Sequence, residues 1–171
     1  MESVSSFPNT DELLQRNAAY AEGGHKSDLP GEPSRHLTVV ACMDARIDPY
    51  AVLGIENGEV HMLRNAGGVI TDDVIRSLCL SQRYLGTREI VLIHHTDCGL
   101  AKVREDELRA ELAAETGEAP EWDLQGFDDP HDDVRLSIKK LQESPFVPHK
   151  SDIRGFVFDV AGGTLDEVTV D

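Results

Sequence analysis

The sequence predicts an α/β fold of three layers, in which helices flank a mainly parallel β-sheet, organised as a single domain over residues 1–171. Two observations support this prediction. Short and nearly uninterrupted apolar runs, typical of strands that are covered on both faces, alternate with segments of helical periodicity. The length suits one domain, and the balance of 40% apolar to 28% charged residues is that of a globular protein.

The chain begins with a helix and a linker. The helical pattern runs over residues 9–23 and ends at Gly23 and Gly24. Proline and glycine then break regular structure over residues 26–34. We expect residues 1–34 to form an N-terminal helix and linker that pack on a partner subunit.

The alternating elements follow in order. Apolar runs predict strands over residues 37–41, 60–63, 89–93 and 154–160, with 165–170 as a hairpin partner of the last. Asp48 and Pro49 open a short helix that Gly54 ends, and Thr71 caps a helix that Gly86 ends. Further helices are expected over residues 104–116 and 132–143.

Charge excludes two classes of partner. With 16 basic and 32 acidic residues the formal charge is −16, and such a field repels nucleic acid and anionic membrane surfaces. Twelve acidic residues lie within 103–133, which predicts either a solvated acidic helix and loop or a protein adapted to high salt. Neither an 18-residue apolar run nor a secretory signal is visible, so a soluble cytoplasmic protein is expected.

The three cysteines do not suggest a disulfide framework, because they are few and odd in number. Cys42 ends the first strand, and His95 and Cys98 follow the third. Ligands bind at the carboxyl ends of parallel strands, so these side chains meet if the two strands are neighbours. Two thiolates and one imidazole suit Zn²⁺ and leave a fourth position open.

Other thiol and imidazole groups have simpler interpretations. Cys79 falls inside an amphipathic helix and is expected to be a core residue. His94 lacks the spacing to Cys98 and is expected to be a strand residue facing core or solvent. The remaining histidines show no partner pattern.

Asp44 and Arg46 follow the first cysteine at intervals of two. A fixed, ionised carboxylate beside the metal would accept the proton of a hydroxide and aim the oxygen at an electrophile. Arg46 could hold Asp44 ionised and turned away from the metal. A surface ion pair is the alternative.

The combination Cys42-x-Asp44-x-Arg46 and His95-x-x-Cys98-Gly99, 53 residues apart at their first positions, resembles the β-class carbonic anhydrases, in particular their compact prokaryotic branch. The resemblance extends through residues 64–68 and 85–90 and reaches the strand at 154–160. It implies one Zn²⁺ per chain on Cys42, His95 and Cys98, with Asp44 and Arg46 as a catalytic dyad that orients and gates the site.

The resemblance also implies a function. A hydroxide on that zinc would attack carbon dioxide and give bicarbonate and a proton, reversibly, in a homodimer or homotetramer. The family implies a second state in which Asp44 itself ligates zinc. Two alternatives remain open from the sequence: a carbonyl sulfide or carbon disulfide hydrolase on the same site, and a non-catalytic zinc-binding module.

Overall fold

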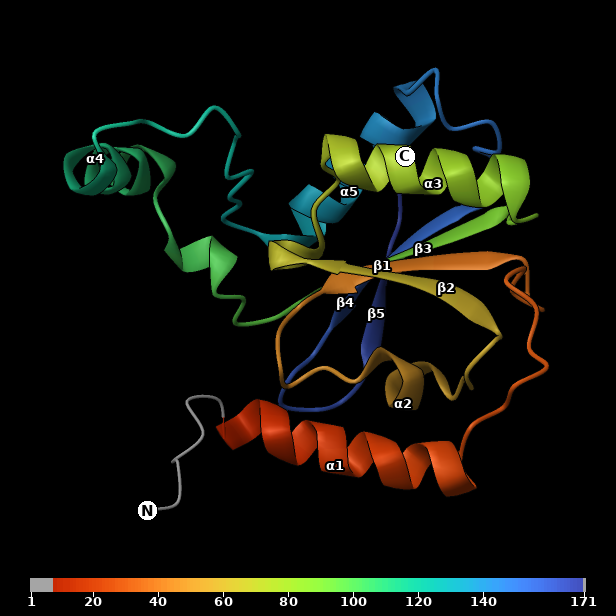
Figure 1. Ribbon diagram of the computed structural model, residues 1–171. Helices are drawn as coiled ribbons and strands as arrows, with labels where there is room; N and C mark the ends of the chain where they lie inside the picture. The colour runs from red at the N-terminus through yellow and green to blue at the C-terminus, as the bar shows by residue number, and fades with distance from the viewer. Residues whose placement is uncertain (1–7, 171) are drawn as a thin grey trace, which may run out of the picture. The chain divides into compact units, whose positions relative to one another are not determined.

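Five strands form one sheet in the order β2-β1-β3-β4-β5 in a computed structural model that describes residues 8–170 (Figure 1). The first four strands are parallel, and β5 pairs antiparallel with β4, as the sequence predicts. Their bounds are β1 Leu37–Cys42, β2 Val60–Asn65, β3 Glu89–His95, β4 Ile153–Phe158 and β5 Leu165–Val168. The expected mainly parallel sheet is therefore confirmed.

Helices cover both faces of the sheet, which gives the predicted three layers. Helices α3 (Asp72–Tyr84) and α5 (Pro130–Glu143) lie on one side and α2 (Pro49–Leu53) on the other (Figure 1). The side chains of β1 alternate between the layers: Val40 packs in the core with α3 and α5, whereas Val39 and Ala41 pack in the core of the opposite face. This alternation decides which face each residue at a strand end serves.

Two helices begin at the capping residues that the sequence predicts, and the last helix begins earlier than expected. Asp48 accepts hydrogen bonds from the backbone N–H groups of Tyr50 and Ala51 in α2, and Thr71 accepts one from that of Val74 in α3. The last of the expected helices begins at Pro130 rather than at residue 132, because Asp129 caps it and Pro130 suits the first helical position. Strand β3 also continues two residues past the expected end at 93, through His95.

Two short 3₁₀ turns were not expected and connect the strands to the helices. They are η1 (Ala66–Gly68), after β2, and η2 (Leu100–Lys102), which precedes α4 (Glu105–Thr116). At Gly68, with φ +72, a Cβ atom would stand 2.9 Å from the backbone nitrogen of Cys42. Only glycine lets η1 approach the end of β1 this closely.

The N-terminal helix α1 (Pro8–Gly23) belongs to a separate unit. The chain divides between Pro30 and Gly31, inside the linker that the sequence predicts. The second unit holds the sheet and the helices described above. No helix in the described part of the chain is both long and apolar enough to cross a membrane.

Candidate metal centre

The carboxyl ends of β1 and β3 lie side by side. These strands pair directly and in parallel, with Ala41 opposite Ile93. Cys42 is the last residue of β1, His95 is the last of β3, and Cys98 follows three positions later. The adjacency on which the sequence prediction depended is therefore present.

Three buried side chains converge at this edge. One sulfur each of Cys42 and Cys98 and one ring nitrogen of His95 all lie within 4.8 Å of one another. The Nδ1 atom of His95 bonds the Thr96 carbonyl oxygen at 2.8 Å, and the carbonyl can only accept, so Nδ1 is the donor. Its Nε2 atom is buried and has no hydrogen-bond partner in the part of the chain that the structure describes.

An unpartnered nitrogen beside two thiols is the arrangement that a metal ion completes. Burying such an atom without a partner costs free energy, and a bond to a metal would remove that cost. Two thiolates and an imidazole form a donor set that binds Zn²⁺ and leaves one tetrahedral position for water or substrate. The three residues present therefore fit the ion that the sequence predicts.

The two thiols have opposite pKa shifts. Burial raises the pKa of Cys98. Burial acts in the same direction on Cys42, but the His95 ring and the backbone N–H groups of Asp44 and Gly67 outweigh it, and the pKa of Cys42 is lowered. The surroundings of Cys42 already favour the thiolate that metal binding requires.

The ion pair expected between Asp44 and Arg46 is present. Arg46 Nε donates to Asp44 Oδ1 at 3.0 Å and Nη2 donates to Oδ2 at 2.9 Å. The hydrogen bonds from Arg46 hold the pKa of Asp44 well below its usual range. Asp44 Oδ2 lies 3.7 Å from His95 Nε2, beside the three converging side chains but outside their cluster.

Arg64 positions the segment that carries Asp44, and the sequence analysis missed this residue. Arg64 Nε donates to the Cys42 carbonyl at 2.9 Å, and Nη2 donates to the carbonyls of Asp44 and Ile47 at 2.9 and 3.1 Å. An arginine near the end of the second strand, followed by a glycine-rich turn, was the available signal. Through these hydrogen bonds β2, which pairs with β1 on the side away from β3, orders the loop that follows β1.

Asp97 was also missed, although it lies inside the His95-x-x-Cys98 motif. Arg46 Nη1 donates to Asp97 Oδ2 at 2.9 Å, and Lys102 contacts the other carboxylate oxygen. Lys102 first, and Arg46 second, lower the pKa of Asp97 to about 2. The carboxylate is therefore ionised and bridges two cations.

His94 points to the opposite face of β3 from His95. Its Nε2 atom lies 2.6 Å from Asp133 Oδ2 on α5, and its ring centroid lies 5.3 Å from that of Phe127. The expectation of a strand residue is confirmed, with the side chain buried. Cys79 departs from its expected core position: Val74 and Leu78 of α3 face the core, and Cys79, one residue further around the helix, is only partly buried.

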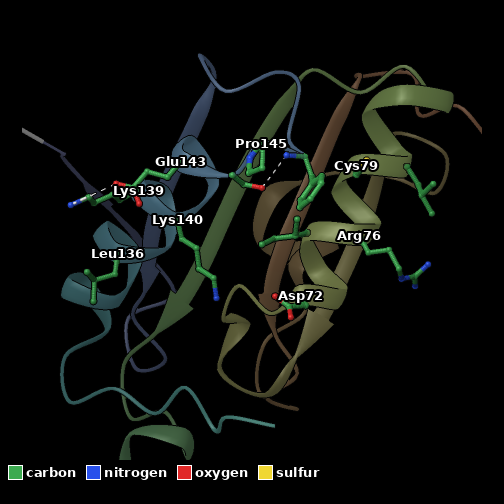
Figure 2. A pocket seen from close by; sticks show the side chains of 12 residues that line it. Asp72, Arg76, Cys79, Leu136, Lys139, Lys140, Glu143 and Pro145 are labelled. Atoms are coloured by element: carbon green, nitrogen blue, oxygen red, sulfur yellow. Dashed lines mark hydrogen bonds and ion pairs between the residues drawn. The ribbon is translucent and has the colours of Figure 1, made fainter. Parts of the chain in front are cut away.

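A hollow of about 1030 Å³ lies elsewhere, between α3 and α5 (Figure 2). Cys79 lines it together with apolar side chains such as Leu136. Its cations already have partners: Arg76 pairs with Asp73, and Lys140 donates to the Ile70 carbonyl. None of the converging side chains at the strand ends lines this hollow, so its size does not mark it as the chemical site.

Comparisons with known proteins agree with the chemistry of the strand ends. Residues 37–122 match the family model described as carbonic anhydrase. Beta-carbonic anhydrase 1 of Mycobacterium tuberculosis is 52% identical over 160 residues, which cover 94% of this chain and 98% of that protein. A carbon disulfide hydrolase of Acidithiobacillus thiooxidans is 32% identical over 77% of this chain and 76% of its own length.

Solved structures give the same result. The crystal structure of carbonic anhydrase from Streptococcus mutans superimposes with a TM-score of 0.89 at 38% identity, over 98% of this chain and all of that one. A β-carbonic anhydrase from Trichomonas vaginalis gives a TM-score of 0.80 at 26% identity, over 96% and 98% of the two chains. The likeness thus includes the sheet, the connections and the segments that carry the converging side chains.

Proposed function

Because this chain belongs to the carbonic anhydrase family, we propose that it hydrates carbon dioxide reversibly to bicarbonate and a proton. The observation that carries the proposal is the buried meeting of Cys42, His95 and Cys98, with an unpartnered His95 nitrogen, beside a carboxylate that arginine holds in place. A purely structural metal site has no need of such a carboxylate.

The cofactor in this proposal is one Zn²⁺ per chain, held by the two thiolates and by His95 Nε2. Zinc in such a site supplies Lewis acidity, which lowers the pKa of a water that it binds from 15.7 to about 7 and makes hydroxide available near neutral pH. The contribution of His95 is orientation: the Thr96 carbonyl fixes its tautomer, so that Nε2 presents a lone pair to the metal.

Asp44 and Arg46 act as the catalytic dyad in this proposal. An ionised Asp44 is an acceptor only, so it takes a hydrogen bond from the nucleophile's O–H and turns the oxygen lone pair toward carbon dioxide. Arg46 keeps the carboxylate ionised and fixes both of its oxygens. Because Arg46 bonds both of these oxygens, Asp44 stays outside the cluster of Cys42, His95 and Cys98, and a metal held there would keep a fourth position open to substrate.

The assembly is proposed to be a homodimer or a homotetramer, in the cytoplasm. Support comes from α1, where Leu13 and Leu14 are 60% and 63% exposed. Apolar side chains that stay exposed on a helix mark a surface for another protein chain. Light scattering at working concentration tests this proposal, and a monomer mass would contradict it.

The first experiment is stopped-flow hydration of carbon dioxide by protein of known zinc content, from about pH 6.5 to about pH 9. Cys42→Ser removes one proposed ligand, and Cys79→Ser is the matched control because its thiol lies outside the cluster. We expect the first variant to lose zinc and activity and the second to retain both. Carbonyl sulfide and carbon disulfide are assayed in parallel, and turnover of these alone would replace carbon dioxide as the substrate.

A further inference from the structure

Arg46 is held from two sides. Toward one side it donates two side-chain hydrogen bonds to the carboxylate of Asp44. Toward the other side, Nη1 donates to Asp97 Oδ2 at 2.9 Å and Nη2 donates to the Asp97 carbonyl oxygen at 3.0 Å. Asp97 therefore accepts as many hydrogen bonds from the guanidinium as Asp44 does.

We propose that Asp97 is a positioning residue of this site, holding the Arg46 guanidinium where it clamps Asp44. The inference rests on the proposed function and adds to it a residue that never touches the reacting atoms. Through Arg46, Asp97 keeps the Asp44 carboxylate turned away from the metal ligands. It thereby favours the arrangement in which the fourth position on the metal is available.

The backbone turn at Asp97 does not by itself account for an aspartate. Its φ of 55° lies in the left-handed region, which glycine adopts freely and which asparagine adopts as readily as aspartate. Either residue would make the same turn between His95 and Cys98. Of the three, only aspartate also offers a charged acceptor to Arg46. The ion pair with Arg46 therefore explains the charge at position 97, which the turn does not explain.

Lys102 completes the arrangement from η2. It contacts Oδ1 of Asp97, the oxygen that Arg46 leaves free, at 2.5 Å. The side chains of Asp97 and Lys102 are 56% and 65% exposed. Water therefore screens their charges, and the effect of Asp97 on Arg46 is expected to be moderate and to weaken as salt is added.

Asp44 has few other restraints. Apart from the Arg46 side chain, its carboxylate accepts a hydrogen bond from the Arg46 backbone N–H at 2.9 Å. Its Oδ2 atom is 3.7 Å from His95 Nε2. If the guanidinium becomes mobile, the carboxylate is free to turn and become a fourth ligand, and a metal with four protein ligands has no open position.

A positioning role and a merely structural role of Asp97 predict opposite changes in the rate at which zinc is released. Zinc-loaded Asp97→Asn keeps the left-handed turn and removes the charge. We expect carbon dioxide hydration to fall about fivefold, as loss of an exposed ion pair permits. We also expect zinc to be released more slowly to an excess of chelator, because Asp44 becomes a fourth ligand. A damaged site would release zinc faster.

Asp73→Asn is the matched control, because it removes an exposed carboxylate from another arginine pair, Asp73 with Arg76 on α3. It should change neither quantity. Lys102→Met should lower activity about twofold in the original chain and have no effect in the Asp97→Asn background, because Lys102 acts only through Asp97. An unaltered Lys102→Met effect in that background would contradict the linkage.

The proposal is overturned if Asp97→Asn leaves activity and zinc release unchanged, or if activity falls while zinc release stays the same or accelerates. Failure of the proposed function is a different result. In that case the original zinc-loaded chain does not hydrate carbon dioxide, whereas Asp97→Asn still slows zinc release and supports the positioning role.

Discussion

Strand β3 directs one histidine to each of its faces, where each lies near an aspartate of another element, and the two pairs differ. His94 and His95 are adjacent and both 0% exposed. His94 Nε2 lies 2.6 Å from Asp133 Oδ2, whereas His95 Nε2 is 3.7 Å from Asp44 Oδ2 and has no hydrogen-bond partner among the described residues. The carboxylates themselves are equally accessible, with side chains 16% and 17% exposed.

The difference lies in what else surrounds each pair. Arg46 holds the Asp44 carboxylate with Oδ2 3.7 Å from His95 Nε2, which is too far for a hydrogen bond, and the sulfurs of Cys42 and Cys98 lie beside that nitrogen. Among residues 8–170, no arginine is hydrogen-bonded to the Asp133 carboxylate. The two adjacent histidines therefore differ in what faces Nε2: a carboxylate oxygen at hydrogen-bond distance for His94, and two thiols for His95.

The largest expected effect comes from exchanging the two histidines separately for glutamine. His95→Gln removes a ligand, so zinc is lost and hydration falls by about 10³-fold or more, because the metal supplies several kcal/mol of transition-state stabilisation. His94→Gln, the matched variant on the other face, should keep its zinc. Metal content and stopped-flow rates measure both, and zinc loss from His94→Gln would break the comparison.

The second largest effect on activity is expected from Asp44, the carboxylate beside the cluster of converging side chains. Asp44→Asn places an amide where an acceptor is needed, so we expect hydration to fall about 10²-fold with zinc content unchanged. Steady-state rates on zinc-quantified protein measure it. Asp73→Asn, which neutralises an exposed carboxylate of α3, is the control and should retain full activity. Equal rates for Asp44→Asn and the original chain would remove Asp44 from the catalytic dyad.

The carboxylate of the other face affects stability instead. Asp133→Ala leaves His94 Nε2 buried without a partner, which costs about 1–3 kcal/mol of unfolding free energy. Hydration should stay within about twofold, since no catalytic group is touched. Asp132→Ala is the control: it lies in the same first turn of α5, but its carboxylate is 74% exposed. Denaturant unfolding compares the two, and equal stabilities would show that the His94 pair contributes nothing.

The meeting of Cys42, His95 and Cys98 was predictable from the sequence, because each residue lies at or just after the end of a predicted strand. Cys42 and His95 end apolar strands, and strands of a parallel sheet end at one edge, so their meeting required only that β1 and β3 be neighbours. Arg64 and Asp97 were not predictable. Arg64 reaches across to the loop after β1, and Arg46 meets Asp97 from 51 positions away, so no short-range pattern connects them.

The fold, like the site, was predictable from sequence only where local patterns determine it. Caps and apolar runs predicted the strands and most helices, whereas η1 and its approach to Cys42 depend on contacts between segments distant in the chain. Cys79 was assigned to the core from its helix pattern alone. Its actual position at the margin of the hollow depends on how α3 rotates against α5, which periodicity does not specify.

The smallest expected effect concerns a second bidentate arginine pair, far along the chain from the dyad. Arg154 binds both oxygens of Glu167 across the β4–β5 hairpin at 2.7 and 2.6 Å. Hydrogen bonding to Arg154 lowers the pKa of Glu167, so the unfolded chain binds a proton more readily than the folded one. The stabilisation is therefore complete above the ordinary glutamate pKa of about 4.3 and is lost as pH falls through the lowered value.

Glu167→Gln removes this pair and leaves the cluster of converging side chains unaltered. Both partners are exposed: the side chain of Arg154 is 63% accessible and that of Glu167 is 46% accessible. We expect its melting temperature to lie within about 2 °C below that of the original chain at neutral pH. Thermal unfolding at decreasing pH should show that the difference between the two melting temperatures disappears once Glu167 of the original chain takes up its proton. A gap that persisted at low pH would mean that packing of the side chain, rather than its charge, stabilises the hairpin. Hydration rates should not change, because neither Arg154 nor Glu167 belongs to the cluster of converging side chains or contacts it.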